Sequence, residues 1–296
     1  MIGVLLIDKP SGPTSHDVVA RLRKSSGERA MGHTGTLDPR ATGLLILVVG
    51  RATRLASLLA TGDKTYDAAI RLGIATDTDD ADGRPIGEPA QALPDDSAVD
   101  AALARLPGTF AQTPPSHSAK KVAGRRAYEI ARREEPVTLA PVAVTVRSID
   151  RLGRDGDLVH VRVTATPGFY VRALARDLGE SLGCGAHLAS LRRIRSGSFD
   201  IDRAMTLDDA QRLGAGLAEW LIAPADALPD LAAVRTTARG LIRVSHGNPL
   251  GPEDLEGRWL PPAATPGPVR ILAEDGRLVA LAHARGGALH PVIVLG

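Results

Sequence analysis

Residues 32–43 read GHTGTLDPRATG and run directly into the apolar segment LLILVV at 44–49. The glycines of this stretch permit a tight backbone that other segments can approach closely. Pro39 fixes its own φ angle and biases the preceding Asp38 toward extended geometry. The apolar segment is long enough for a buried strand but far shorter than the roughly 20 residues of a membrane span. We therefore predict a stiff loop that holds one carboxylate beside a buried strand.

Strand and helix patterns surround this loop without regular alternation. Apolar periodicity predicts strands at residues 3–7, 66–72, 142–147 and 159–163. Helical patterns begin at Thr14 or Ser15, near Arg51, near Val171 and after Thr206, which pairs with Asp209 in a capping box. This mixture favours an α+β fold over a doubly wound parallel sheet.

The length of 296 residues suggests about two domains. A linker is expected at 224–229, and the chain beyond it has short strands separated by Gly and Pro loops, which indicates a small β-rich module. We predict a first domain over 1–228 and a second over 229–296. Within the first, residues about 114–140 form a basic insertion, with one helical piece expected around 126–133.

Composition sets limits on the class of protein. The chain is 44% hydrophobic and 24% charged with a formal net charge of +2, which is typical of an ordinary soluble protein rather than a polycation. Its single cysteine, Cys184, excludes an internal disulfide framework and a multi-cysteine zinc site. The N-terminus lacks a basic lead, and its apolar run is too short for a signal peptide. We therefore expect a soluble cytoplasmic protein.

The loop at 32–43 closely resembles the catalytic-loop motif of the TruB family of pseudouridine synthases. Five further motifs resemble that family in collinear order, over about the first 200 residues: LIDKP at 6–10, DKTY at 63–66, TDTDDADG at 76–83, GFYVR at 168–172 and GCGAHL at 183–188. The resemblance implies a catalytic domain with a mixed, mainly antiparallel sheet flanked by helices. The tail is similar in position to a PUA-type RNA-binding module, although only VSHGNP at 244–249 resembles one in sequence.

The resemblance also implies roles for single residues. Asp38 matches the nucleophile, Tyr66 matches a tyrosine that stacks on the target base, and Arg172 matches an arginine paired with the catalytic carboxylate. Such an arginine would favour the ionised form of Asp38. The implied substrate-binding positions are His33, Lys9, Tyr170, Leu191, Lys120, Lys121, Arg125 and Arg126. Of these, His33 would fill the space left by a flipped nucleotide, and the last four lie in the insertion, which resembles a thumb loop that clamps RNA.

The activity implied is isomerisation of uridine 55 in the T loop of tRNA to pseudouridine. The reaction breaks an N-glycosidic bond and forms a C-glycosidic bond to the same ring, so we expect no cofactor and no metal. The expected partner is the T arm of tRNA, without a membrane or an obligate protein partner, and we expect a monomer. The sequence leaves open whether Asp38 attacks the base or the ribose.

Three other functions remain as hypotheses. A non-catalytic protein that binds or folds tRNA would keep the fold without the chemistry, and a related synthase would act on another RNA. A metal phosphohydrolase would use the acidic turn at 77–83. An EF-hand pattern fails there, because Gly83 at the sixth loop position puts Pro89 at the twelfth. We interpret the stretch as a solvated turn near the active cleft, with Asp80 behind the residues that contact substrate.

Overall fold

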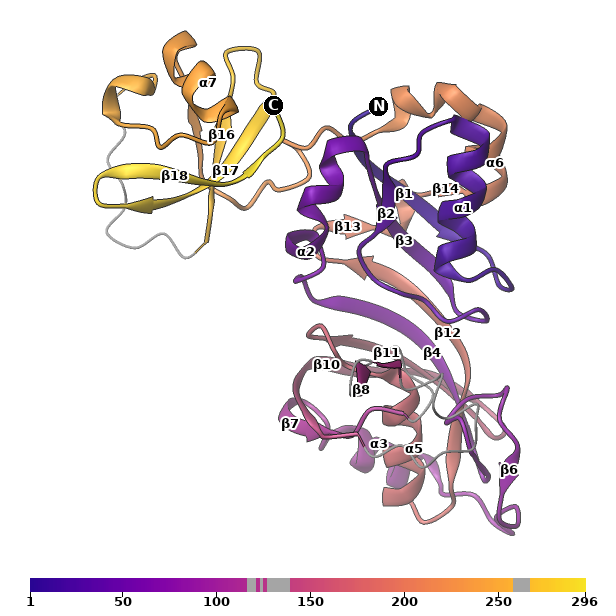
Figure 1. The fold of residues 1–296 in the computed structure, drawn as a ribbon. Helices are drawn as coiled ribbons and strands as arrows, with labels where there is room; N and C mark the ends of the chain where they lie inside the picture. Colours follow the sequence, from indigo (N-terminus) through magenta and orange to yellow (C-terminus); the bar gives the residue numbers. More distant parts are fainter. Residues whose placement is uncertain (116–120, 123–124, 127–138, 258–266) are drawn as a thin grey trace.

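The computed structural model describes residues 1–115, 121–122, 125–126, 139–257 and 267–296. The larger part of the molecule is built around a long, curved sheet, and a smaller β-rich part lies to its side (Figure 1). The larger sheet has ten strands among the described residues. Its main path runs in the order β14 (Met205–Thr206), β1 (Gly3–Lys9), β3 (Thr42–Val49), β12 (Ala186–Ser196), β4 (Lys64–Leu72), β11 (Leu158–Ala165), β10 (Val142–Asp155) and β7 (Gly108–Gln112), with β2 (Met31–His33) beside β3 and β13 (Phe199–Asp200) beside β12.

The sheet is mixed and mainly antiparallel, as predicted. Only β14 against β1 and β12 against β3 are parallel pairs among the described strands of this sheet. The second pair brings Arg193 opposite Gly43, so the end of the glycine loop lies directly beside β12. Because β12 also pairs with β4 over most of its length, this contact joins β14, β1 and β3 to β4, β11, β10 and β7.

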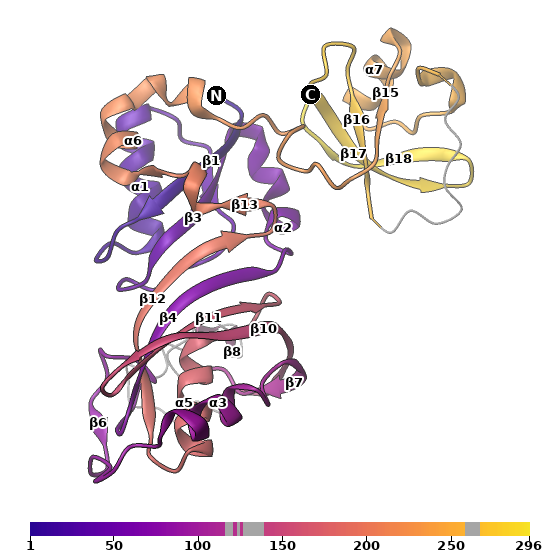
Figure 2. The ribbon, with the colours of Figure 1, turned by 180° about the vertical axis from the view of Figure 1, so that it is seen from behind.

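Helices cover the sheet in separate groups (Figures 1 and 2). The α-helices are α1 (Ser15–Ser26), α2 (Ala56–Leu59), α3 (Asp96–Leu103), α5 (Val171–Ser181), α6 (Leu207–Leu213) and α7 (Ala238–Ser245), and the 3-10 helices are η1 (Gly50–Leu55), η2 (Ile201–Arg203), η3 (Gly214–Trp220) and η4 (Pro252–Asp254). The predicted caps are present: Thr14 and Asp17 form a capping box on α1, and Thr206 accepts from the backbone of Asp209 on α6. The helix predicted at 51–60 is mostly 3-10.

The apolar run of β3 is explained by burial on both faces of the sheet. Leu45 and Leu47 pack with α1 and α6, whereas Leu44 and Ile46 pack on the opposite face with residues of η1 and α2. A strand covered on both sides needs no polar alternation, which is why this segment reads as continuously hydrophobic. The catalytic-loop motif is therefore anchored to a strand in the centre of the fold.

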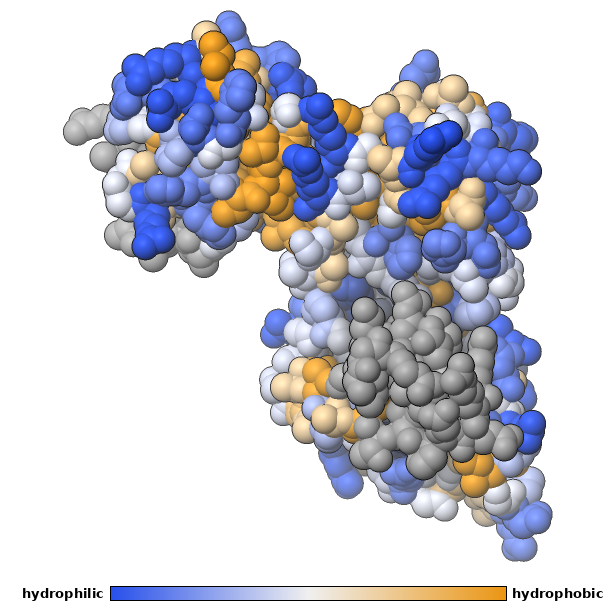
Figure 3. All heavy atoms as spheres, viewed as in Figure 1, coloured by the Kyte–Doolittle hydropathy of each residue, from blue (hydrophilic) through white to orange (hydrophobic). Residues whose placement is uncertain are grey.

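A four-stranded sheet forms the small C-terminal part, and the predicted β-rich module is thereby confirmed. Its strands are β15 (Ala233–Arg235), β16 (Val269–Leu272), β17 (Leu278–Arg285) and β18 (Ala288–Val294). Leu278, Leu281 and Leu295 join the core cluster that contains Val4 and Ile46, so this sheet packs against the large one. Hydrophobic residues gather on the small part where it adjoins the large part (Figure 3). The domain boundary at 228/229 stays a prediction.

Two smaller hairpins complete the described chain. β5 (Ala75–Thr76) and β6 (Pro85–Ile86) flank the acidic turn, and β8 (Lys121–Val122) pairs with β9 (Arg125–Arg126) in the basic insertion. Arg126 therefore lies in a strand, which corrects the expected start of a helix at that residue, and residues 127–133 lie outside the described chain. No helix in the described ranges is long and apolar enough to cross a membrane.

Gly43 provides a test of how closely the loop approaches β12. Its φ angle is +97°, and an added Cβ atom would lie 2.3 Å from the backbone oxygen of Arg193. Gly43→Ala should reduce the free energy of unfolding by more than the roughly 1–2 kcal/mol that a left-handed backbone costs an L-residue. Gly108→Ala is the matched control, because Gly108 has a φ angle of +128° with open space around it. Equal losses for the two variants in urea unfolding would contradict the close packing.

Candidate active site

The loop that carries Asp38 connects β2 to β3 and is fixed from several sides. The backbone N–H of Leu37 donates to Oγ of Ser15 at 2.8 Å, and the same hydroxyl donates to the carbonyl of Leu37 at 3.1 Å. The N–H of Ala41 donates to the carbonyl of Asp38 at 3.1 Å, which closes a turn around Pro39. Asp38 is thus held on a rigid segment between a helix start and a central strand.

Lys9 stabilises this turn through hydrogen bonds to backbone carbonyls. Its Nζ donates to the carbonyls of Pro39 and Ala41 at 3.0 and 2.7 Å, and to that of Pro10 at 2.9 Å. Burial lowers the pKa of Lys9 to about 8, and the charge of Asp38 opposes that shift. With 0% of the residue exposed, Lys9 has no surface for a substrate. Lys9 holds the loop of Asp38 in place, and its expected contact with substrate stays a prediction.

Arg172 joins Asp38 to the acidic turn. Its Nε lies 3.2 Å from Oδ2 of Asp38, and its Nη1 lies 3.4 Å from Oδ2 of Asp80, while only 7% of the arginine side chain is exposed. Oδ1 of Asp80 in turn accepts from Oγ1 of Thr78 at 2.6 Å and from the N–H of Asp82 at 3.0 Å. The guanidinium therefore lies between two carboxylates in a fixed direction.

The position of Arg172 depends on the start of α5. Tyr170 precedes the helix, and its N–H donates to Oε1 of Gln112 at 2.8 Å, while Nε2 of Gln112 donates back to the carbonyl of Tyr170 at 3.1 Å. Gln112 is the last residue of β7 and is buried. Gln112 was not predicted from the sequence, because it lies 58 positions away from Tyr170, which it holds in place.

Burial raises the pKa of Asp38 above the ordinary value of 3.8. Arg172 and Lys9 oppose this rise, whereas Asp80 and Asp82 add to it. The Asp38 side chain is still 46% exposed, so its surroundings remove part of its hydration but leave it in contact with solvent. Arg172 acts in the direction expected from the sequence, but loss of hydration is the larger effect on this carboxyl group.

The acidic turn is neutralised by arginines. Asp79 lies 3.1 Å from Arg176, Asp80 pairs with Arg172, and Asp82 forms an ion pair with Arg40 of the catalytic loop. Nowhere in the described ranges does a group of three or more His, Cys, Asp or Glu side chains stand ready to hold a metal ion. The turn also bonds to β12, because the N–H of Leu188 donates to the carbonyl of Asp79 at 3.0 Å. The acidic turn therefore forms one wall of the candidate active site. The sequence had predicted a turn near the active cleft at this position.

A small hollow opens beside Asp38. Asp38, Arg172 and Leu191 line it together with Asp80 and Asp82. Its volume of about 30 Å³ is room for one or two water molecules. A uracil ring is larger than that, so a base enters only if part of the lining moves. The ion pair of Arg40 with Asp82 lies in this lining and is exposed, so opening it costs little.

Tyr66 and His33 lie next to this group. Tyr66 is on β4 and buried, directly across from Arg193 of β12. Burial raises the pKa of the Tyr66 phenol, and Arg193 opposes that rise. His33 ends β2 half-buried, and its Nδ1 has no hydrogen-bond partner among the described residues. Burial lowers the pKa of this imidazole, which favours the neutral ring.

The remaining predicted residues belong to the insertion. Lys121, Arg125 and Arg126 lie in the β8–β9 hairpin, and Lys120 lies outside the described residues. The structure thus brings Asp38, Arg172 and Leu191 into one hollow, with Tyr66 on the adjacent strand.

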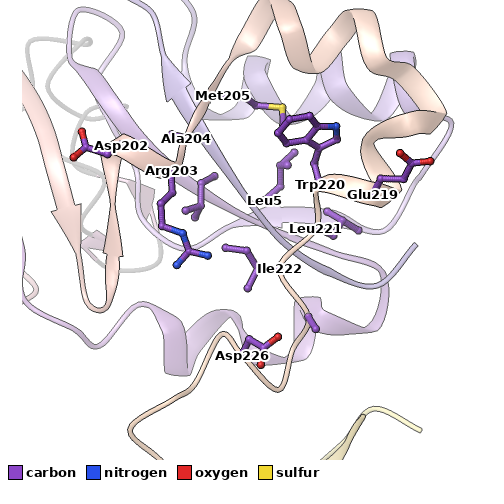
Figure 4. A pocket seen from close by; sticks show the side chains of 12 residues that line it. Leu5, Asp202, Arg203, Ala204, Met205, Glu219, Trp220, Leu221, Ile222 and Asp226 are labelled. Carbon is purple, nitrogen blue, oxygen red and sulfur yellow. The ribbon is translucent and has the colours of Figure 1, made fainter. Parts of the chain in front are cut away.

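A larger hollow of about 840 Å³ lies elsewhere, along the outer edge of β1 (Figure 4). Leu5, Ile222 and Trp220 give it an apolar wall, and Arg203 and Glu219 lie at its rim. Asp38, Arg172 and Tyr66 are not among its lining residues. We assign the candidate active site to the smaller hollow, because the paired and pKa-shifted groups converge there.

Comparison with known proteins gives three family matches along the chain. They are the N-terminal domain of the TruB family of pseudouridylate synthases at residues 23–171, the C-terminal domain of tRNA pseudouridylate synthase B at 172–227, and the C-terminal region of tRNA pseudouridine synthase II at 253–296. The chain is 45% identical to tRNA pseudouridine synthase B of Thermobifida fusca, over 99% of this chain and 98% of that protein. It is 44% identical to the protein of the same name from Nocardia farcinica, over 99% and 93%.

Solved structures share the fold. A chain of a Cbf5-Nop10-Gar1 complex superimposes with a TM-score of 0.74 at 26% identity, over 100% of this chain and 85% of that one. A chain of an H/ACA RNP bound to a substrate RNA containing 2′-deoxyuridine superimposes with a TM-score of 0.73 at 25% identity, with the same coverage.

The electrostatics around Asp38 predict opposite effects of two substitutions. Arg172→Gln removes a charge that lowers the pKa of Asp38, so this pKa should rise further above 3.8. Asp80→Asn removes a charge that raises it, so the pKa should move back toward 3.8. Carboxyl ¹³C NMR titration measures both. Shifts of the same sign in the two variants would contradict the geometry described.

Proposed function

Because the chain belongs to the TruB family of pseudouridylate synthases, we propose that Asp38 is the nucleophile with which it converts a uridine of tRNA to pseudouridine. The observation that carries this proposal is the pairing of the Asp38 carboxylate with Arg172, at 3.2 Å, inside a hollow lined by Leu191. The substrate position is uridine 55 in the T loop.

The reaction begins with extrusion of the nucleotide, because its reacting atoms are hidden in the folded RNA. The lining of the hollow moves to admit the uracil ring, and Leu191 then packs against it. His33 lies on the strand before the loop, where a neutral ring can stack in the gap that the nucleotide leaves. The Nδ1 atom of this imidazole is buried and has no hydrogen-bond partner within the described structure.

Asp38 then attacks, at the base or at the ribose. Either attack needs an ionised carboxylate at near-van der Waals distance and a fixed angle. Lys9 fixes the turn that carries Asp38, and Arg172 fixes the direction of its oxygens. The bond between N1 and the ribose breaks, and a bond from C5 to the same ribose carbon forms. In sum, C5 loses one proton and N1 gains one, so the balance requires no redox change and no imported group.

Two further regions extend the contact to the rest of the tRNA. Lys121, Arg125 and Arg126 lie in the β8–β9 hairpin of the insertion, and we propose that these basic residues contact phosphates. The C-terminal module is a second RNA-binding surface, comparable in place to a PUA domain. We propose that a monomer acts on the T arm of tRNA in the cytoplasm without an obligate protein partner.

The tRNA substrate is favoured over another RNA by the degree of similarity. Proteins named tRNA pseudouridine synthase B reach 44–45% identity over nearly the whole chain, whereas the superimposed H/ACA and Cbf5 chains reach 25–26%. The presence of Asp38, Tyr66 and Arg172 together also favours an enzyme over a protein that only binds RNA.

Asp38→Asn tests the nucleophile. An amide keeps the shape of the side chain but cannot attack, so pseudouridine formation in a tRNA transcript should fall by about 10⁴-fold or more. Affinity for the transcript should change only a few-fold. Tritium release from [5-³H]uridine measures the reaction, and filter binding measures the affinity.

Asp82→Asn is the matched control for that experiment. It removes the same charge from the lining of the same hollow, but its carboxylate pairs with exposed Arg40 and not with Arg172. We expect activity within about tenfold of the wild type, since an exposed ion pair contributes up to about 1 kcal/mol. Similar losses in Asp82→Asn and Asp38→Asn would remove the special role of Asp38.

Neutralising Lys120, Lys121, Arg125 and Arg126 by Gln tests the insertion. The slope of log affinity for tRNA against log salt should become shallower by roughly 0.7–0.9 for each phosphate that the insertion no longer neutralises. Filter binding between low and physiological salt measures this slope, with thermal unfolding as the check on folding. An unaltered slope would mean that the insertion does not touch the phosphate backbone.

A further inference from the structure

Arg193 is a buried cation that the reaction described so far does not use. Only 2% of the residue is exposed. Its Nε donates to the carbonyl of Leu44 at 2.7 Å, and its Nη2 donates to the carbonyl of Gly35 at 3.0 Å. None of the ion pairs found among the described residues joins Arg193 to an Asp or Glu. A buried guanidinium without a carboxylate is costly, so its presence needs an explanation.

The surroundings of Arg193 increase that cost. Lys9 is fully buried, and Lys64 is 9% exposed with its Nζ donating to the carbonyls of Ala60 and Gly62. Burial is the main cause of the lowered pKa of both lysines, which is about 8 in each case, and repulsion from Arg193 adds to it. A purely structural side chain in this place would be better uncharged, since buried charges are often replaced by apolar groups without loss of stability.

The third contact of Arg193 is with Tyr66. The two residues are register partners on β12 and β4, so their side chains lie on the same face of the sheet. The guanidinium has donors and no acceptor. Toward the phenol oxygen it can act only as a donor, so the proton of the Tyr66 hydroxyl stays free to bond elsewhere.

We propose that Arg193 is a positioning residue for the reaction, which connects Tyr66 to the catalytic loop and keeps the phenol ready for proton transfer. This rests on the proposed function. One guanidinium donates to the carbonyl of Gly35, three residues before Asp38, and lies beside Tyr66 on the neighbouring strand, so the phenol and the carboxylate share one rigid support. A phenolate formed at Tyr66 faces this charge directly.

In this geometry Tyr66 first donates a proton and later accepts one, so it undergoes no net change. The phenol gives its proton to N1 of the detached uracil, and the phenolate then takes the proton that leaves C5 after the new bond has formed. Tyr66 returns to its starting form, and no other proton donor is required. The charge of Arg193 opposes the effect of burial on the phenol, which otherwise disfavours the phenolate.

A double-mutant cycle tests this coupling. Arg193→Met removes the charge at similar volume, and Tyr66→Phe removes the hydroxyl. In single-turnover assays on a tRNA transcript, with enzyme above its Kd, Arg193→Met should slow the reaction about 10²-fold, the lower range for proton-transfer catalysis. In the Tyr66→Phe background the same substitution should slow it by less than about threefold. Equal factors in both backgrounds would overturn the proposal.

Two further variants make the cycle specific. Arg192→Met changes the neighbouring arginine, which pairs with Asp8 at 2.7 Å, and its effect should be the same with Tyr or Phe at position 66. Arg193→Lys keeps the charge but cannot reproduce the fork of donors, and it serves if Arg193→Met fails to fold. Its loss should also depend on Tyr66. An additive cycle in an active enzyme overturns the role of Arg193 alone, whereas absence of pseudouridine from wild-type reactions overturns the proposed function.

Discussion

The fixation of one loop by buried cations is the constraint on which the site depends. Lys9 and Arg193 donate to backbone carbonyls at opposite ends of the segment from Gly35 to Ala41, and Asp38 lies between these ends. Carbonyl groups are weaker partners than carboxylates, so the chain accepts a considerable desolvation cost here. In the proposed mechanism, what it gains is a nucleophile whose backbone does not need to be ordered when substrate arrives.

A rigid loop has a consequence for substrate entry. The hollow next to Asp38 is too small for a base, and the backbone of the Asp38 loop, which forms part of its lining, is held by Lys9, Ser15 and Arg193. The movement that admits the uracil ring therefore falls on side chains rather than on the backbone of this loop, such as the exposed side chains of Arg40 and Asp82 or that of Leu191. In the proposed mechanism, the attacking carboxylate is positioned before substrate binds, and the side chains around the base then adjust to it.

Much of this arrangement could be predicted from the sequence. The loop at 32–43, its neighbouring strand and the capped helices are local patterns, because glycine, proline and cap residues act on their own backbone. The approach of Arg172 to Asp38 came from resemblance alone. Gln112 could not be found, because it holds Tyr170 across a strand pairing that has no local signature.

Arg193 is a different case, since a signal was present. It stands among the basic residues Arg192, Arg193 and Arg195, a pattern that is typical of a charged surface rather than of a buried site. The two-residue period of a strand puts it on the same face as Leu191, a predicted pocket residue, and away from Arg192. That Lys9 contacts substrate stays a prediction: a motif shows that a residue is near a site but not on which side of the backbone it lies, and the side chain of Lys9 is buried.

The most direct test of the central claim is a crystal structure with a T-arm RNA that carries 5-fluorouridine at position 55, whose C5–F bond cannot release a proton. The account predicts that this nucleotide leaves its stack and lies between Leu191 and Asp38, with a carboxylate oxygen within about 3.5 Å of the ring or the ribose or bonded to it. A nucleotide that stays stacked in the RNA, or that enters another hollow, would contradict it.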